Sequence, residues 1–425
     1  MDKIPNLRHL VAFVAVVKHG SISKASESIF LSQPAITQAL AKIEKELKAS
    51  LFERKTDGMN LTPEGELFSF RIERALEMLN QAIKKNYRLD KTSGSPGSPS
   101  LFAVTTTQLR ALVAVSEAQN YSAAGRNIGV SQSSLYRACK DLEEYMGTVL
   151  FEKTSLGVSP SKAAQSLSRA IKLAFNEINQ GIAEIDANNN ISSGSIIVGS
   201  LPLARTCILP NAINEFTEIR PDFNVSVLDG LYEDLLEHLR RGELDVIVGA
   251  LRFPMPSYDV HQETLFFTSN VILARKGHPL GQLKKPVTLD DLCRYGWVVS
   301  RKNTPGRTMF EQLFTTKEHV LPQQIIEASS QMLVREIVVG SDKLTMLPKH
   351  QVHRELSDGA FEIIPYDTEQ QKRAIGITIR KSWRGTTAQE AFIDTIRKIG
   401  LSLIKLYEID IGYPLLAIQN LNSQY

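Results

Sequence analysis

Leu10-Val11-Ala12-Phe13-Val14-Ala15-Val16 opens a stretch of sequence that this chain contains twice. A shift of 99 positions places Leu10–Glu53 on Leu109–Glu152 without a gap, and 15 of the 44 aligned pairs are identical. A solenoid needs more than two stacked repeats, whereas two copies of a unit with its own apolar face indicate two small domains of similar fold. Each copy has the apolar spacing of a helix-turn-helix, and Ser32-Gln33 in the first copy aligns with Ser131-Gln132 in the second. The sequence therefore predicts two DNA-binding units in one chain.

The composition is that of an ordinary globular protein, with 425 residues, 43% of them hydrophobic and 22% charged. The sequence shows no signal leader and no apolar run long enough for a membrane span, so we expect a cytoplasmic protein without a membrane partner. Cys139, Cys207 and Cys293 lack CxxC spacing, which disfavours disulfide and zinc sites and predicts small buried side chains. Common enzyme motifs are absent and the eight histidines show no ligand spacing, so we expect no enzyme, metal or cofactor.

The positive charge is distributed unevenly, although the formal net charge of +3 is too small by itself to indicate nucleic-acid binding. Residues 1–90 contain 14 Lys and Arg against 11 Asp and Glu, whereas residues 101–187 contain 8 of each. Residues 188–425 carry a net charge of −1. The excess lies on the first copy, which favours stronger contact with phosphates by that copy than by the second.

Local signals in the first copy predict three helices and a hairpin. Gly20 is expected to end the first helix, and Ser32 to cap the third with Pro34 in its first turn, where a missing N–H costs nothing. A short hairpin in the shape of a wing and a long helix from Thr62 to about Arg88 follow. The expected organisation is winged helix-turn-helix 1 over 1–61, linker helix 1 over 62–90, a flexible linker over 91–100, winged helix-turn-helix 2 over 101–158, linker helix 2 over 159–190, an α/β domain over about 192–400 and a tail over 401–425.

Short β-rich runs alternate with helical segments from residue 192 onward. Ser195–Val198, Val225–Asp229 and Asp245–Gly249 are expected strands, with helices over Leu209–Glu218 and Tyr232–Arg241 between them. This alternation predicts βαβ units and an α/β fold. The segment is long enough for two lobes, lobe I over about 192–268 and 367–400 and lobe II over about 269–366.

Five motifs follow one another near the N-terminus: Leu10 to Val16, Ser21-Ile22-Ser23-Lys24-Ala25-Ser26, Leu31-Ser32-Gln33-Pro34-Ala35-Ile36-Thr37-Gln38, Leu51-Phe52-Glu53-Arg54 and Leu61-Thr62-Pro63-Glu64-Gly65. In this order they resemble the LysR-type transcriptional regulators. Later segments, including Leu239–Val246 and Leu344–Pro348, are similar to the family's effector-binding domain. The resemblance covers residues 1–90 and about 192–400. It implies an all-α winged helix-turn-helix with a linker helix, followed by a two-lobed, periplasmic-binding-protein-like α/β domain.

The departure from the family is the inserted second unit, residues 101–187, which looks like another copy of the winged helix-turn-helix and linker helix. In this copy Ser133 replaces the proline after Ser-Gln, and the family's Thr-Pro-x-Gly is matched to Ser159-Pro160-Ser161-Lys162, without the glycine. Recognition helices place N-terminal side chains against base edges, where glutamine can pair with adenine; isolated polar residues of this kind more often form a solvated face. The candidate DNA-contacting residues are Ser32, Gln33, Pro34, Thr37, Gln38, Arg54 and Lys55, with Ser131, Gln132, Ser133, Tyr136, Arg137 and Lys153 in the second copy.

The resemblance also implies that a small effector binds between the two lobes. Two loops follow expected strands and precede helices, and the second contains Arg301 and Arg307, whose planar guanidinium groups suit carboxylates and phosphates. We therefore expect a small anionic effector, although the two arginines are equally explained as surface charges. The candidate effector-binding residues are Ser200, Leu201, Pro202, Leu203, Thr268, Ser300, Arg301, Thr304, Arg307, Ser329 and Ser330.

The sequence thus predicts an effector-responsive transcription regulator whose partners are double-stranded DNA, a small molecule, further copies in a dimer or tetramer, and RNA polymerase. Two alternatives stay open for the linker helices: they pair within one chain, in place of the usual dimer, or between chains. Two rival functions also stay open. In the first, the second unit is a protein-interaction or dimerisation domain and does not read DNA. In the second, the protein bends DNA constitutively and its cleft holds no effector.

Overall fold

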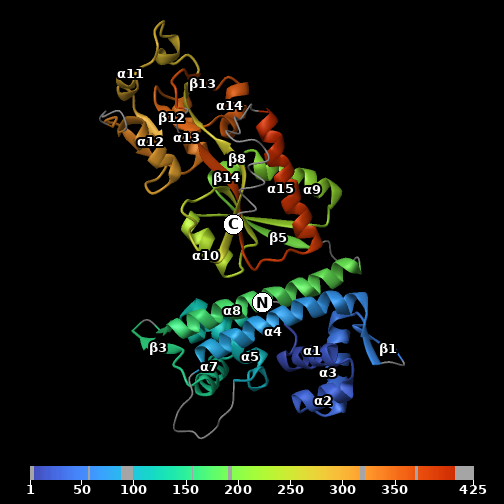
Figure 1. Cartoon of the computed structure of the whole chain (residues 1–425). Helices are drawn as coiled ribbons and strands as arrows, with labels where there is room; N and C mark the ends of the chain where they lie inside the picture. The colour runs from blue at the N-terminus through green and yellow to red at the C-terminus, as the bar shows by residue number, and fades with distance from the viewer. Residues whose placement is uncertain are drawn as a thin grey trace. The chain divides into compact units, whose positions relative to one another are not determined.

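The computed structural model describes residues 4–55, 58–87, 99–155, 157–189, 194–315, 321–368 and 372–406, and it divides into two compact units. Unit 1 contains the chain up to Gly194 together with Arg241–Glu243, and unit 2 contains the remainder (Figure 1). Most of the expected flexible linker over 91–100 and of the tail over 401–425 lies outside the described residues. None of the described helices has both the length and the apolar character needed to cross a membrane.

Unit 1 contains the same series of elements twice: three helices, a two-stranded hairpin and a long helix. The first series is α1 (Leu7–His19), α2 (Ile22–Ile29), α3 (Gln33–Leu47), β1 (Phe52–Lys55), β2 (Gly58–Leu61) and α4 (Pro63–Asn86). After a short 3-10 turn (Leu101–Ala103), the second series is α5 (Thr106–Ala118), α6 (Tyr121–Ile128), α7 (Gln132–Met146), β3 (Phe151–Thr154), β4 (Gly157–Pro160) and α8 (Lys162–Asn188).

The helix ends of the first series are where the sequence predicts them. Gly20 ends α1 in the left-handed region with φ of 63°, which glycine adopts without steric cost. Ser32 Oγ accepts a hydrogen bond from Ala35 N at the start of α3, and Thr62 Oγ1 accepts one from Gly65 N at 3.0 Å at the start of α4. The expected apolar stripe of α3 is buried, namely Ile36, Leu40, Ile43 and Leu47.

Individual hydrogen bonds also recur at a distance of 99 residues. Glu44 Oε1 accepts from Leu51 N at 2.8 Å and thereby joins α3 to its hairpin. Glu143 Oε1 accepts from Leu150 N at 2.7 Å in the second series. Because the tethering side chain and its acceptor atom are the same, the two series share their local architecture as well as their element order.

The second long helix begins at Lys162, three residues after the start of 159 that the sequence predicts for linker helix 2. Pro160 lies in β4 opposite Phe151, a hairpin position where its missing N–H is tolerated. Ser161 caps α8 by accepting from Ala164 N, and its Oγ donates to Val149 O at 2.8 Å. Ser161 is therefore the equivalent of Thr62. The match of the Thr-Pro-x-Gly motif to Ser159-Pro160-Ser161-Lys162 was wrong, because both a proline and a serine stand near this boundary.

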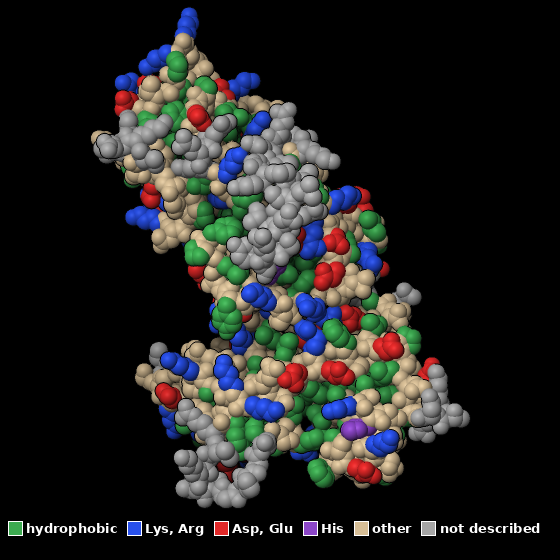
Figure 2. Space-filling model, viewed as in Figure 1, with side chains coloured by type: hydrophobic (Ala, Val, Ile, Leu, Met, Phe, Trp, Pro, Cys, Tyr) green, Lys and Arg blue, Asp and Glu red, His purple; other side chains and the backbone are tan. Residues whose placement is uncertain are grey.

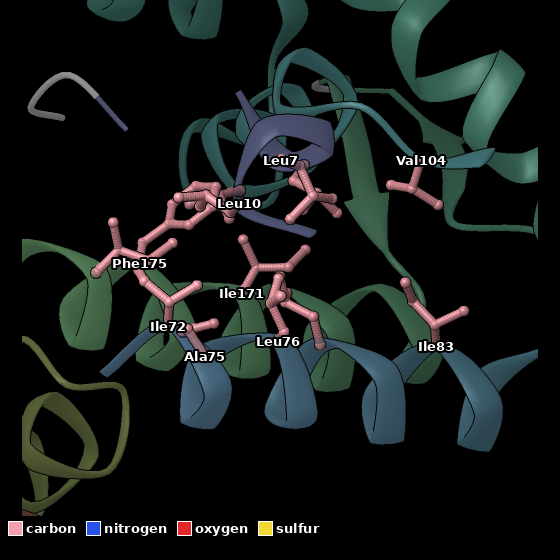
Figure 3. Close-up of a cluster of buried hydrophobic side chains, with 14 of the residues drawn as sticks. Leu7, Leu10, Ile72, Ala75, Leu76, Ile83, Val104, Ile171 and Phe175 are labelled. Atoms are coloured by element: carbon pink, nitrogen blue, oxygen red, sulfur yellow. The ribbon is translucent and has the colours of Figure 1, made fainter. Parts of the chain in front are cut away.

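A single apolar core joins the two series of unit 1, because α4 and α8 pack side by side (Figure 1). The two helices are antiparallel, since Asn188 near the end of α8 donates to Glu64 near the start of α4 at 2.7 Å. Figure 3 shows Ile72 and Leu76 of α4 and Ile171 and Phe175 of α8 gathered near Leu7 and Leu10 of α1. At the first turn of α1, Leu7 N donates to Thr106 Oγ1 at 2.8 Å, so residues 99 positions apart meet.

Unit 2 contains two five-stranded sheets. The first has the order β6-β5-β7-β14-β8, in which β5 is parallel to β6 and β7 while β14 is antiparallel to β7 and β8. Its strands are β5 (Ser195–Ser200), β6 (Asn224–Asp229), β7 (Val246–Ala250), β8 (Val260–Thr268) and β14 (Arg373–Arg380). The covering helices are α9 (Ile208–Ile219), α10 (Tyr232–Arg240) and α15 (Thr387–Leu406).

The second sheet has the order β11-β10-β12-β9-β13. Its strands are β9 (Asn270–Arg275), β10 (Trp297–Val299), β11 (Ile325–Glu327), β12 (Leu344–Pro348) and β13 (Phe361–Ile364). The accompanying helices are α11 (Leu289–Cys293), α12 (Pro305–Thr315), α13 (Gln331–Val339) and α14 (His353–Ser357). The chain crosses from the first sheet to the second at Ser269, between β8 and β9, and returns between β13 and β14.

Strand β8 is the main element that the sequence did not indicate. Its central residues His261, Gln262, Glu263 and Thr264 are all half-buried, so they show no alternation of polar and apolar side chains. A bulge opposite Ile375 and Gly376 interrupts the pairing with β14. The cysteine prediction is confirmed for Cys139 and Cys207, which are buried, whereas Cys293 is half-buried.

Candidate functional sites

The polar face of α3 lies opposite its buried stripe. Gln33, Thr37 and Gln38 are exposed on this face, as are Ser32 and Pro34 at the start of the helix. Gln33 Nε2 donates to Ser23 Oγ of α2 at 3.4 Å, and Thr37 Oγ1 donates to Gln33 O at 3.0 Å. These contacts orient the first turn of α3 while its outward edges stay accessible.

The corresponding face of α7 is a shallow groove lined by Gln132, Ser133, Tyr136, Arg137 and Lys140. Ser122 Oγ of α6 donates to Gln132 Oε1 at 2.6 Å, which repeats the Ser23–Gln33 contact with its polarity reversed. The ring of Tyr136 packs edge-on against Tyr121 at 5.5 Å. Ser131 caps α7, and Lys153 is exposed on β3. The side chains of Arg54 and Lys55 lie outside the described part of the structure.

On the face that Figure 2 shows, charge alone does not single out a binding surface. Figure 2 shows Lys and Arg side chains interspersed with Asp and Glu on the face in view. Geometry is the more specific signal here, because α3 and α7 each expose a short polar face next to a two-stranded hairpin. Such a helix can enter a major groove while its hairpin reaches the backbone.

Unit 2 has a cavity of about 430 Å³ between its two sheets. Seven of the candidate effector residues line it: Leu201, Pro202, Leu203, Ser300, Arg301, Thr304 and Ser329. These residues come from loops after β5, β10 and β11, so the chain brings three separate strand ends together at the cavity. This is the usual position for ligands in open α/β sheets.

Four candidate effector residues point elsewhere. Ser200 is fully buried, and its backbone carbonyl accepts a hydrogen bond from Arg205 at 2.9 Å. Thr268 is also buried, and its Oγ1 lies 3.4 Å from His350 Nδ1. Arg307 pairs with Glu311 at 2.7 Å on its own helix. Ser330 caps α13 by accepting from Leu333 N, which is the ordinary structural role of such a serine.

Three cavity arginines were missed in the sequence. Arg205 forms an ion pair with Asp229 at 2.9 Å. The Arg252 guanidinium lies 4.3 Å from the centre of the Tyr232 ring, and its Nη1 donates to Ala250 O at 3.2 Å. Arg373 Nε is buried and has no hydrogen-bond partner among the described residues.

Arg373 ends beside the first turn of α12. A Cβ added at Gly306 would lie 3.7 Å from Arg373 Nη1 and 3.1 Å from Ser300 Oγ. Thr304 Oγ1 caps the same turn by accepting from Arg307 N at 3.3 Å. The cavity therefore combines the half-buried Arg373 cation with the positive end of a helix, an arrangement that favours an anion.

Burial makes the charged forms of the arginines at this cavity less favourable. Burial lowers the pKa of Arg252, and it lowers the pKa of Arg373 to about 10, with the nearby Arg252 cation contributing in the same direction. Two half-buried cations in contact with one cavity are unfavourable unless an anion or acidic residue compensates them. Ala328, Val334 and Met346 supply apolar wall around the same space. No group of three or more acidic, histidine or cysteine residues in the described ranges is arranged to hold a metal ion.

Comparison with known protein families gives two matches. The model of the bacterial regulatory helix-turn-helix protein, lysR family, matches residues 7–66 and again residues 106–165. The LysR substrate binding domain matches residues 189–399. The two helix-turn-helix matches are separated by 99 residues, the same shift that superimposes the two sequence copies.

Individual relatives agree. The HTH-type transcriptional regulator GalR of Pseudomonas putida is 32% identical over 397 residues, which cover 93% of this chain and 98% of that protein. Among solved structures, ArgP of Mycobacterium tuberculosis matches with a TM-score of 0.55 and 17% identity, covering 69% of this chain and 96% of that chain. A full-length OxyR variant of Pseudomonas aeruginosa matches with a TM-score of 0.52 and 22% identity over 68% and 94% of the two chains. The two structures share the fold.

Proposed function

This chain belongs to the LysR family of transcriptional regulators, and from that premise we propose that one polypeptide carries two DNA-reading units under the control of one effector domain. The chain is a DNA-binding transcription regulator with a ligand-binding domain, and like its relatives it is not an enzyme. The proposal concerns the second helix-turn-helix match and the chemistry of the effector.

The observation that carries the two-reader proposal is the repeated geometry of α3 and α7. Both helices begin with a capping serine and an exposed glutamine that contacts a serine of the preceding helix. Both are tied to a hairpin by a glutamate. The side chains that follow differ, since Thr37 and Gln38 are replaced by Tyr136 and Arg137. We infer that the two units read different sequences, so the operator combines two unlike half-sites.

Footprinting on the intergenic DNA upstream of the chain's own gene tests this proposal. The variants are a Gln132→Ala/Arg137→Ala double and the equivalent Gln33→Ala/Gln38→Ala double, with Glu144→Ala as a matched control at an exposed α7 position. Each double variant is expected to lose a different part of the footprint, because base contacts contribute about 1–3 kcal/mol each. The control keeps the whole footprint.

An unchanged footprint for the Gln132→Ala/Arg137→Ala variant contradicts the two-reader proposal. The second unit is then a protein-interaction or dimerisation domain, a role consistent with the equal numbers of acidic and basic residues over 101–187. Circular dichroism of each variant confirms that a lost footprint reflects lost contacts and not an unfolded unit.

For the effector we propose a small anion with an apolar body, bound in the cavity between the two sheets of unit 2. Arg252 and Arg373 bind its carboxylate or phosphate together with the α12 N-terminus, and the apolar wall holds the remainder. Two observations support this chemistry: the buried Arg373 Nε has no hydrogen-bond partner among the described residues, and the like charge of Arg252 lies nearby. Of the sequence candidates, we retain the seven that line the cavity.

Titration calorimetry of the full chain with benzoate, gluconate and glucose 6-phosphate tests the anion class. Benzyl alcohol is the neutral control for benzoate. At least one anion is expected to bind while the neutral analogue does not, because charge-assisted contacts to buried arginine are lost without the anion. Equal binding of benzoate and benzyl alcohol, or no binding of any anion, contradicts the proposed effector chemistry.

Other properties stay predictions. A cytoplasmic location follows from the location of the DNA that the protein binds, and assembly into dimers or tetramers follows from the resemblance to the family. Contact with RNA polymerase and a likeness of unit 2 to periplasmic binding proteins are further predictions from that resemblance.

A further inference from the structure

The antiparallel helices α4 and α8 enclose a buried charged cluster. Arg71 of α4 has a side chain that is 2% exposed, and its guanidinium contacts Glu177 at 3.2 Å and Glu184 at 2.5 Å on α8. It also donates to Gln180 Oε1 at 2.9 Å. Arg74 adds a second contact to Glu177, at 3.0 Å. In each of these ion pairs the cation is on α4 and the carboxylate is on α8.

The apolar part of this interface is nearly the same on both helices. A shift of 99 residues pairs buried Phe68 with Leu167, Ile72 with Ile171, Ala75 with Ala174, Leu76 with Phe175 and Leu79 with Ile178. Either helix therefore has an apolar stripe that would suit a copy of itself as well as its partner. The apolar stripes alone do not explain why α4 pairs with α8.

The polar residues of the interface are different on the two helices. The same shift pairs Arg71 with Ala170, and it pairs Glu177 and Glu184 with Met78 and Lys85. The α8 residue beside the Arg71 stem is Gly181, where an added Cβ would lie 3.0 Å from Arg71 Cβ. The α4 equivalent of this glycine is Ala82, so α4 lacks the space that α8 provides.

Pairing of like helices in the same antiparallel register would leave these charges without partners. Two copies of α4 would place Arg71 opposite Met78 and Lys85, which adds a like charge. Two copies of α8 would place the carboxylates of Glu177 and Glu184 opposite Ala170. An unpaired buried charge is strongly unfavourable, whereas a paired one is tolerated. The charges thus disfavour the pairing of α4 with α4 or of α8 with α8, and they favour the pairing of α4 with α8.

We propose that α4 and α8 of one chain are a matched pair, and that the cluster of Arg71, Glu177 and Glu184 prevents either helix from pairing with a copy of itself. Unit 1 is then complete within one chain, and its long helices are not available to a second copy or to another regulator that pairs through like helices. Further contacts between the two series support the same pairing, since Thr148 Oγ1 donates to Asn86 O at 3.2 Å and the rings of Tyr87 and Tyr145 lie 5.9 Å apart. The proposal holds whether or not α7 reads DNA.

Cross-linking of the full chain tests the pairing. Glu64 Oε1 and Asn188 Nδ2 are 2.7 Å apart, so a Glu64→Cys/Asn188→Cys variant places two thiols at opposite ends of the same contact. A short bis-maleimide is expected to give an internally bridged monomer on a denaturing gel. Wild type and the two single-cysteine variants are the controls for the native Cys139, Cys207 and Cys293. Both positions are at the helix ends, away from the apolar core.

The other outcomes of this experiment overturn the proposal. A covalent dimer of the double variant shows that α4 pairs with α8 of another chain. Absence of any cross-link at these positions shows that α4 and α8 are not paired in solution, as expected if like helices pair instead.

The role of the charges is tested by adding Arg71→Glu to the double-cysteine variant, with Lys84→Glu as the matched reversal of an exposed charge on the same helix. The rate of internal bridging is expected to fall at least about tenfold for Arg71→Glu and to stay unchanged for Lys84→Glu. Arg71→Met supplies the same measurement if Arg71→Glu does not fold. Bridging at the wild-type rate in the folded Arg71 variant contradicts a selective role for the cluster.

Discussion

Replacing Arg373 by methionine should stabilise the free protein and at the same time weaken its response to anions. Methionine keeps the unbranched apolar stem and removes the charge. Arg373 is half-buried, and its Nε is a buried atom that has no hydrogen-bond partner among the described residues. If Arg373 had a purely structural role, this substitution would lower the free energy of unfolding. If Arg373 instead binds a ligand, the substitution raises the free energy of unfolding of the ligand-free protein.

The size of the effect follows from the pKa of Arg373. Burial and the Arg252 cation lower this pKa from 12.5 to about 10. A pKa change of that size makes the charged guanidinium roughly 3 kcal/mol less favourable in the folded protein than in water. Because methionine loses some contacts, we expect Arg373→Met to raise the free energy of unfolding by about 1–3 kcal/mol. For a unit of this size each kcal/mol raises Tm by about 2–4 °C.

The assay is urea and thermal unfolding of the full chain, with and without the anion identified by calorimetry. Arg301→Met is the matched control, since Arg301 also lines the cavity but is exposed. Arg373→Met should raise Tm of the free protein and reduce anion affinity by about 30-fold or more. Arg301→Met should change Tm by no more than about 1 °C, as expected of an exposed side chain.

Loss of stability in Arg373→Met, with an unchanged anion affinity, would contradict a ligand-binding role for Arg373. Arg373 would then be a structural residue with a partner in the folded protein, and the site of the effector would have to be sought elsewhere in the cavity. An unchanged Tm together with reduced anion affinity would contradict only the cost of burying the Arg373 charge, and not its role in binding.

Further predictions concern stability. Arg71→Met should lower the free energy of unfolding by about 3 kcal/mol in urea, because Glu184 loses the Arg71 cation and Glu177 keeps only Arg74, while Lys84→Glu should have little effect. Glu143→Ala should cost about 2 kcal/mol, because its carboxylate accepts two backbone N–H groups at the start of β3, and Glu144→Ala at an exposed position is its control. Burial lowers the pKa of His350 to about 4 from its ordinary 6.5, so the unfolded chain binds more protons between these values. Stability should therefore rise from pH 4 to pH 6.5 by up to roughly 3 kcal/mol, and His350→Phe should flatten that rise in thermal melts.

Local features of the fold were predictable because they depend on nearby residues. The caps at Ser32 and Thr62, the helix end at Gly20 and the buried stripe of α3 all follow from short-range chemistry. The repeat also predicted the second series of elements. Its one error, the match to Ser159-Pro160, arose because the motif was matched by residue type and not by the constant shift of 99 residues.

Features that depend on distant residues were missed. Arg252 follows β7 and Arg373 begins β14, so only the folded sheet brings them to one cavity. The pairing of α4 with α8 did leave a signal, because Arg71 interrupts the apolar spacing of Phe68, Ile72 and Ala75. A charge at a buried helix position requires a partner, and the buried Glu177 on α8 has the opposite sign.

The central claim, two DNA-reading units in one chain, is tested most directly by counting chains on DNA. The measurement is native mass spectrometry of the full chain on the shortest duplex that contains the complete footprint, with the number of protected major-groove segments read from the same footprint. The account predicts two protected segments for every bound chain. One protected segment for every chain would contradict it.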